Sequence, residues 1–213
     1  MHKVLKHILA ASLAILALNA SFGQAKLGLK LTSSIINQRI SQSEDMVAVS
    51  RGANAFVPSF TIYTDMTIAK NYCFSTGLGY ISKRINLNVQ QSFDGMSQSQ
   101  NYNIQYLQIP ATLKLYTSEI ALDKKLYFQL GPIFDIAIHS KENNNSLLII
   151  DKFRPVDISL MFSAGLEIQV APNTAIQLGI NYSRGMVNVI ADASVADLSI
   201  KNDLYGIDLA IKF

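Results

Sequence analysis

The sequence predicts an all-β fold: an eight-stranded antiparallel up-and-down transmembrane β-barrel, preceded by a cleaved signal peptide. Three observations lead to this prediction. Apolar side chains recur at every second position in eight segments, and a period of two is that of a strand, because successive side chains leave a pleated backbone on opposite faces. The longest segments exceed the usual strand of about 5–6 residues and suit the roughly 9–11 tilted residues that cross a bilayer. The connections between them alternate long and short.

The clearest strands lie at 126–138 and 157–170. On one face of each, apolar residues take every second place: Leu126, Phe128, Leu130, Pro132, Phe134, Ile136 and Ile138 in the first, and Ile158, Leu160, Phe162, Ala164, Leu166, Ile168 and Val170 in the second. The other face is small or polar and includes Asp135, Gly165 and Glu167. Such a face suits the hydrated lumen of a barrel better than the apolar core of a sandwich.

Composition agrees with a surface that faces lipid. The 213 residues are 49% hydrophobic and only 15% charged, against about 25% charged in soluble proteins. Beyond Ala20 there is no uninterrupted apolar run near the roughly 20 residues that a membrane helix needs. The apolar residues are therefore expected to face lipid from strands.

The N-terminus has the three parts of a secretory signal peptide. Lys3 and Lys6 form a short basic region, residues 8–18 form an apolar core, and small and polar residues follow. We expect cleavage after Gly23, with cleavage after Ala25 as the alternative. A retained membrane helix is disfavoured because the apolar core is short and no stop-transfer flank follows it.

The predicted domains are therefore a signal peptide at 1–23 and an outer-membrane β-barrel at 24–213. Loss of Lys3 and Lys6 lowers the formal charge from +3 to +1, so the charge gives no reason to expect a nucleic-acid partner.

The remaining elements follow from the same alternation. The eight predicted strands are 26–32, 56–63, 72–81, 106–115, 126–138, 157–170, 175–183 and 205–213. Long polar connections, expected to be loops, are 33–54, 83–101, 139–154 and 184–203. For 83–101, extension of the flanking strands above the membrane is an open alternative. Short connections are 65–71, 118–124 and 171–173.

The alternation of connections sets the predicted topology. In outer-membrane barrels the short turns are periplasmic and the long loops lie outside, which puts both chain ends of an even-stranded barrel at the periplasmic side. Closure is required because lipid offers no partner for the N–H and C=O groups of a sheet edge. Eight strands enclose an interior that side chains fill, so a conducting pore is not expected.

Charged residues on the inward face are predicted to form paired, hydrogen-bonded networks, because unpaired buried charges are costly. This predicted lumen charge network comprises Lys30, Lys114, Asp135, Glu167, Asp208 and Lys212. Tyrosines near strand ends are expected in the aromatic girdles at the membrane interfaces. They are Tyr72, Tyr80, Tyr116, Tyr182 and Tyr205.

Several short motifs occur together in a fixed order. They are Tyr106-Leu107-Gln108-Ile109-Pro110 with Leu113-Lys114, Gly131-Pro132, the strand from Asp157 through Ser163-Ala164-Gly165-Leu166-Glu167, and Tyr182-Ser183-Arg184-Gly185 with Asn188. This set resembles the PorT-like outer-membrane β-barrel domain of gram-negative bacteria. Phe213, which ends an alternating strand, resembles the signal read by the barrel-insertion machinery. The resemblance implies an integral outer-membrane protein, connected to protein secretion or surface assembly, and supplies no catalytic residues.

Two function classes follow. The first is a non-enzymatic barrel of structural or binding role, whose polar outer loops, or whose wall, bind a partner protein, lipopolysaccharide or another surface ligand such as a glycan. The second is a lipid-modifying or proteolytic enzyme using His139, which lies beside Ser140 and near Glu142. Adjacent strand residues point to opposite faces, which disfavours the enzyme. A small-solute channel is a third class, disfavoured by charged residues that fill the bore.

No cofactor or metal is indicated. The exported chain has one cysteine and one histidine, without a carboxylate cluster at metal-ligand spacing. Gly77-Leu78-Gly79 lies inside a strand with no helix after it, so it is not a phosphate-binding loop. The expected partners are outer-membrane lipid and the insertion machinery.

Overall fold

The computed structural model describes residues 25–42, 47–91, 97–142, 150–193 and 197–213. The predicted signal peptide, 1–23, lies outside them. The strands are β1 (Ala25–Ser41), β2 (Val47–Arg51), β3 (Ala55–Ala69), β4 (Tyr72–Gln91), β5 (Ser97–Tyr116), β6 (Lys124–Glu142), β7 (Ile150–Phe153), β8 (Val156–Ala171), β9 (Thr174–Gly185), β10 (Ile190–Ala193) and β11 (Ser199–Lys212). Within the described ranges, no helix has the length and apolar character needed to span a membrane.

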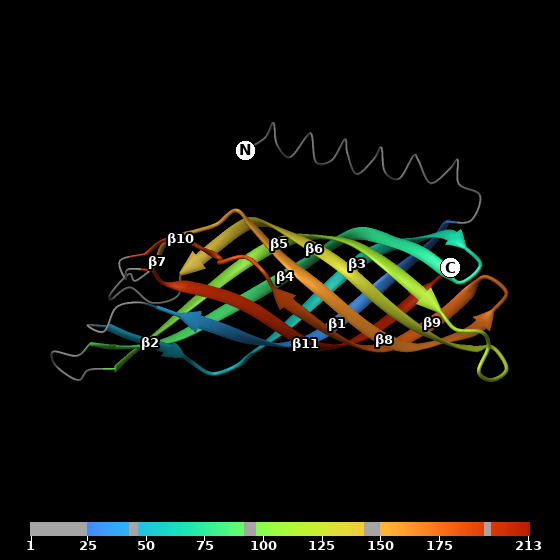
Figure 1. Cartoon of the computed structure of the whole chain (residues 1–213), viewed down its shortest axis with the longest axis horizontal. Coiled ribbons are helices and arrows are strands. Elements are labelled where there is room, and N and C mark those ends of the chain that lie inside the picture. The colour runs from blue at the N-terminus through green and yellow to red at the C-terminus, as the bar shows by residue number, and fades with distance from the viewer. Residues whose placement is uncertain (1–24, 43–46, 92–96, 143–149, 194–196) are drawn as a thin grey trace, which may run out of the picture.

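Eight of these strands close into a barrel. They pair antiparallel in the order β1, β3, β4, β5, β6, β8, β9 and β11, and β11 pairs back with β1. The predicted eight-stranded up-and-down barrel is thereby confirmed. The short turns and the C-terminus lie at one end, on the right in Figure 1, and the long hairpins lie at the other. By the rule for outer-membrane barrels, the right-hand end is periplasmic.

The barrel wall changes character part of the way along its strands. On β4 the outward residues up to Tyr80 are apolar or aromatic except for Thr76, and those from Ser82 are polar. Their partners on β5 change in step, from Leu107 to Gln105. The inward residues change the other way, from polar Ser75 to the apolar residues Ile81, Ile85, Leu87 and Val89, with buried Lys83 as the exception. A barrel wall that is apolar outside is suited to lipid, whereas a wall that is polar outside and apolar inside is suited to water. The lipid band therefore ends at this level.

Beyond the lipid band the strands continue into a water-exposed part, which we call the head. Its described residues are 36–42, 47–57, 81–91, 97–106, 138–142, 150–155, 184–193 and 197–204. The head has its own buried apolar cluster, which includes Ile36, Val57, Ile85, Leu87, Ile104, Val189 and Ile200. The short strands β2, β7 and β10 belong to it, and all three lie at the left-hand end of Figure 1, where β7 pairs with β10 and β2 pairs with β4.

The prediction that 33–54, 139–154 and 184–203 are loops is wrong for most of their described residues. β1 runs on to Ser41 and β2 follows, β6 runs on to Glu142, and β7, β10 and the start of β11 lie in the other two segments. For 83–101, strand extension is the correct alternative. The reason is that outward head positions are polar, so the segments look like loops in composition although their inward positions are apolar.

The aromatic girdle is only partly as predicted. Tyr80 and Tyr205 are exposed at the outer edge of the lipid band, and Tyr182 stacks on Tyr205 with ring centroids 4.9 Å apart. Tyr72 is exposed at the periplasmic start of β4. The prediction for Tyr116 is wrong, because its hydroxyl forms hydrogen bonds with lumen side chains instead of facing the membrane interface.

The position of the lipid band can be tested by adding one charge at two depths. Leu209 faces outward near the middle of the band on β11, whereas Asn88 faces outward in the head. Leu209→Arg is expected to cost about 2–4 kcal/mol of unfolding free energy in phospholipid vesicles, because a cation must sit in hydrocarbon. Asn88→Arg should change it by less than about 0.5 kcal/mol. Urea unfolding followed by circular dichroism measures both, and equal losses would place the band elsewhere.

Candidate functional site

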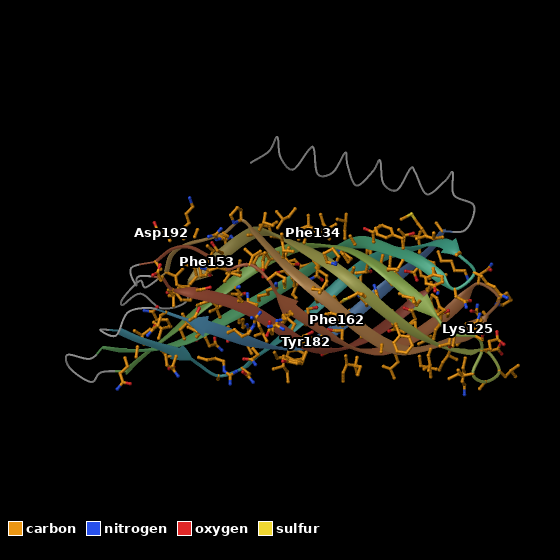
Figure 2. All side chains as sticks on the ribbon, viewed as in Figure 1. Lys125, Phe134, Phe153, Phe162, Tyr182 and Asp192 are labelled. Atoms are coloured by element: carbon orange, nitrogen blue, oxygen red, sulfur yellow. The ribbon has the colours of Figure 1, made fainter. Side chains whose placement is uncertain are left out.

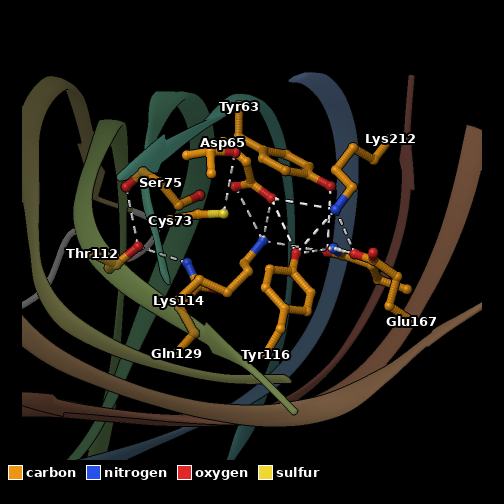
Figure 3. Close-up of polar contacts among 12 residues, drawn as sticks. Tyr63, Asp65, Cys73, Ser75, Thr112, Lys114, Tyr116, Gln129, Glu167 and Lys212 are labelled. Carbon is orange, nitrogen blue, oxygen red and sulfur yellow. Dashed lines mark hydrogen bonds and ion pairs between the residues drawn. The ribbon is translucent and has the colours of Figure 1, made fainter. Parts of the chain in front are cut away.

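Charged side chains from four strands meet in the periplasmic half of the lumen. Lys114 Nζ lies 3.0 Å from Asp65 Oδ2, and Lys212 Nζ lies 2.5 Å from Glu167 Oε2 and 3.8 Å from Asp65 Oδ2. All four side chains are at most 10% exposed. Figure 3 shows both ammonium groups converging on Asp65. We call this group the lower cluster.

Uncharged polar groups form further hydrogen bonds with the charged groups of the lower cluster. The Tyr116 hydroxyl accepts hydrogen bonds from Lys212 Nζ at 3.0 Å and from Gln177 Nε2 at 3.1 Å. Gln177 Nε2 also donates to Glu167 Oε2 at 2.5 Å. The rings of Tyr63 and Tyr127 lie within 4.9 and 5.5 Å of the Lys114 ammonium. The cluster is therefore a packed polar core in which cation–π contacts add to the ion pairs and hydrogen bonds.

A second buried group, the upper cluster, lies nearer the outer end of the lipid band. Lys83 Nζ lies 2.6 Å from Asp135 Oδ2 and 2.8 Å from Asp157 Oδ2, and these side chains are 0–1% exposed. Gln108 Nε2 donates to Asp135 Oδ1 at 3.0 Å. One ammonium thus joins strands β4, β6 and β8 across the lumen.

The six residues of the predicted network lie at three places. Lys114, Glu167 and Lys212 meet in the lower cluster, and Asp135 belongs to the upper one. Asp208 Oδ1 accepts hydrogen bonds from Thr32 Oγ1 at 2.6 Å and Asn181 Nδ2 at 2.8 Å. Lys30 lines the small cavities beside Asp208 and forms no ion pair within the described ranges.

Three charged partners are missing from the sequence prediction: Asp65, Lys83 and Asp157. The sequence prediction assigns Asp65 and Lys83 to connections, but each keeps the inward alternation of its strand, Asp65 with Tyr63 and Lys83 with Ile81. Asp157 lies in a predicted strand, but the predicted charge network does not include it. Extending the period of two past the apolar residues places Asp65 and Lys83 on the inward face, which Asp157 already occupies in the predicted strand.

His139 and Phe213 both lie on the outside. His139 is exposed, pairs with Gln105 just beyond a register shift, and has no hydrogen bond or ion pair within the described residues. The side chain of Glu142 lies outside those residues. Phe213 is exposed, and its backbone N–H donates to the Leu27 carbonyl at 2.8 Å. No group of three or more potential metal ligands occurs in the part of the chain that the structure describes.

The sequence matches a family model. The model described as outer membrane protein beta-barrel domain covers residues 20–191. The chain therefore belongs to this family and is an integral protein of the outer membrane, surrounded by its lipid. The narrower resemblance to PorT-like barrels stays a prediction. A search of curated proteins found no match.

Solved structures of outer-membrane proteins are similar to this chain at low identity. OprG from Pseudomonas aeruginosa is 12% identical, with a TM-score of 0.55 over 89% of this chain and 96% of OprG. Neisserial surface protein A is also 12% identical, with a TM-score of 0.48 over 89% of this chain and 99% of its own. The outer membrane protein AlkL, whose structure was determined in lipid bilayers, is 13% identical, with a TM-score of 0.48 over 90% of this chain and 92% of AlkL. The likeness to OprG supports the barrel fold.

The upper cluster gives a sharp test of lumen pairing. Lys83→Met is expected to lower the unfolding free energy by about 3–5 kcal/mol, because two buried carboxylates lose their counter-charge. Adding Asp135→Asn and Asp157→Asn should recover much of that loss. Urea unfolding in vesicles measures the three proteins.

The matched control is Lys125→Met. Lys125 forms an exposed pair with Glu119 at 3.8 Å, and such pairs contribute about 0–1 kcal/mol. If Lys83→Met cost no more than this control, the upper cluster would not stabilise the barrel.

Proposed function

We propose that the protein is a non-enzymatic binding component of the outer membrane, with the head as its contact surface for a protein or surface glycan. The observation that carries this proposal is the head itself. Spanning lipid needs only the apolar band, yet β4 and β5 each run for 20 residues and bury a separate apolar cluster above it. A rigid scaffold that presents polar side chains to water is suited to recognition.

The outward face of the head is rich in amides and is held in place. On β4 and β5 it carries Arg84, Asn86, Asn88, Asn101, Asn103 and Gln105. Ser82 Oγ donates to Asn103 Oδ1 at 2.6 Å, and Arg51 donates to Asn37 Oδ1 across the gap between β2 and β1. Amides both donate and accept hydrogen bonds, so this face matches peptide backbone or sugar hydroxyls. The contact surface is thus built from strands instead of the predicted loops.

A channel is disfavoured by the packing of the lumen. Among the described residues, two cavities between the lumen side chains have volumes of about 30 and 10 Å³, room for one or two water molecules. The Tyr127 hydroxyl lies where a side chain on Gly165 or Gly179 would begin. With solute passage disfavoured, the outer surfaces are the parts left for function.

The enzyme hypothesis gains no support from the surroundings of His139. Ser140 and His139 are neighbours on one strand and are both exposed, and the described residues hold no carboxylate bonded to the imidazole. A general base needs a partner that orients it and a nucleophile within reach. Recognition therefore remains the better proposal, and the PorT-like resemblance supports a partner in protein secretion or surface assembly.

Photo-crosslinking in intact cells tests the binding proposal. A photoreactive phenylalanine analogue placed at Asn88 or Asn103 in the head is expected to trap a specific protein or polysaccharide adduct. The same analogue at Leu209 in the lipid band serves as the matched control, and at Leu122 it probes the periplasmic turn. Adducts found only at Leu122 would move the contact surface to the periplasmic end, and their absence at both head positions would overturn the proposal.

Conductance in planar bilayers tests the closed lumen. The wild-type barrel is expected to show no ohmic channel, because side chains fill its bore. Lys114→Ala combined with Tyr127→Ala should open a measurable leak, since both side chains span the lower lumen. Steady conductance of the wild-type protein would contradict the lumen packing described above.

A further inference from the structure

We propose that the outer wall formed by β5, β6, β8, β9 and β11 holds a binding site for one molecule of lipopolysaccharide, with an acyl chain in a groove and a phosphate against a basic group above it. The site lies on the lipid-facing surface and at its outer edge. It is separate from the head face on β4 and β5, and it does not depend on what binds there.

The groove runs across the strands between two rows of paired outward residues. One row is Leu130, Phe162, Tyr182 and Tyr205, and the other is Leu115, Phe128, Ala164 and Ile180. Its volume is about 680 Å³, far above that of the lumen cavities. Figure 2 shows Phe162 and Tyr182 together on this wall.

Ala164 deepens the groove at its centre. It is flanked in register by Phe128 and Ile180, and along its own strand by Phe162. A small residue among large neighbours leaves space against the wall, and the large neighbours supply apolar sides. From β5 to β11 the groove crosses four strand spacings, about 19 Å, which is the scale of one extended acyl chain.

The groove ends at the outer edge of the lipid band. The stacked pair of Tyr182 and Tyr205 closes it there, and aromatic residues at this depth normally sit at headgroup level. Arg184 follows two residues beyond Tyr182 on the same face, about 7 Å further along the strand. An acyl chain in the groove therefore directs its headgroup toward Arg184.

The basic group above the groove has an unmatched positive charge. Arg184 is exposed and has no ion pair within the described residues, although it pairs in register with Asp203. The Asp203 carboxylate is already held by Arg39 Nε at 2.8 Å and by the Gly185 N–H at 3.1 Å. Lys201 pairs in register with Arg39 on the outward face.

The local charge fits a phosphorylated headgroup. Arg39, Arg184 and Lys201 with Asp203 carry a net charge of +2, and arginine binds phosphate through two parallel hydrogen bonds. The outer leaflet of this membrane is built from lipopolysaccharide, whose acylated sugars carry phosphates. The apolar groove on the lipid-facing wall matches an acyl chain, and the arginines above the groove match the phosphates of the headgroup. The two parts of the site are thus in the same order as the two parts of the molecule.

Native mass spectrometry of the full barrel in detergent tests the site with bisphosphorylated hexa-acyl lipid A as the probe. The wild type is expected to retain one lipid A, and phosphatidylglycerol at equal concentration should not displace it. Ala164→Phe fills the groove and Arg184→Gln removes the phosphate partner. Each should weaken binding about tenfold, and removing the lipid A phosphates should weaken wild-type binding but not that of Arg184→Gln.

Two matched controls separate this site from the rest of the surface. Ala111→Phe enlarges an outward alanine on β5 away from the groove, and Lys70→Gln removes an exposed cation from the periplasmic turn between β3 and β4. Neither should change lipid A binding. Heat-modifiable migration checks that each variant is folded, and Arg184→Gln tests the site even where Ala164→Phe does not fold. Equal losses in the controls, unchanged binding by Arg184→Gln, or displacement by phosphatidylglycerol would overturn the proposal.

Discussion

The whole structure depends on the hydrogen bonding of backbone groups in lipid. Hydrocarbon offers no partner to an N–H or C=O group, so a sheet that crosses the membrane must have no free edge. Pairing of β11 with β1 removes the last edge. Closure then divides every strand into an outward and an inward face, and the solvent on each side decides which residues are stable there.

The same strands serve two solvents, and this explains the change of face along the barrel. In the band, apolar residues face lipid and polar ones fill the lumen, whereas in the head polar residues face water and an apolar cluster fills the interior. The alternation continues without interruption through Ile81 and Ser82 on β4. Only the chemical identity of the two faces is exchanged, at the level where the surrounding medium changes.

Polar residues in a narrow lumen must in turn be paired. Lys83, Lys114 and Lys212 each contact carboxylates that come from other strands, so the ion pairs tie the barrel across its bore. Packing of this kind leaves little space for a solute. Because the lumen has little room for a ligand, we propose that function lies on the outer surfaces. These are the head, which is built from strands, and the lipid-facing wall with the basic residues at its outer edge.

The sequence by itself determined the eight strands, their alternation and the inward direction of Lys114, Asp135 and Glu167, because a period of two is a local property of an extended chain. The partners of these charges were decided by closure. Lys83 meets Asp135 and Asp157 only because the stagger of β4, β5, β6 and β8 places them at one level. The sequence alone does not predict the head for a related reason. Its polar outward residues have the composition of loops, and only the assembled barrel shows that the residues between them form a core.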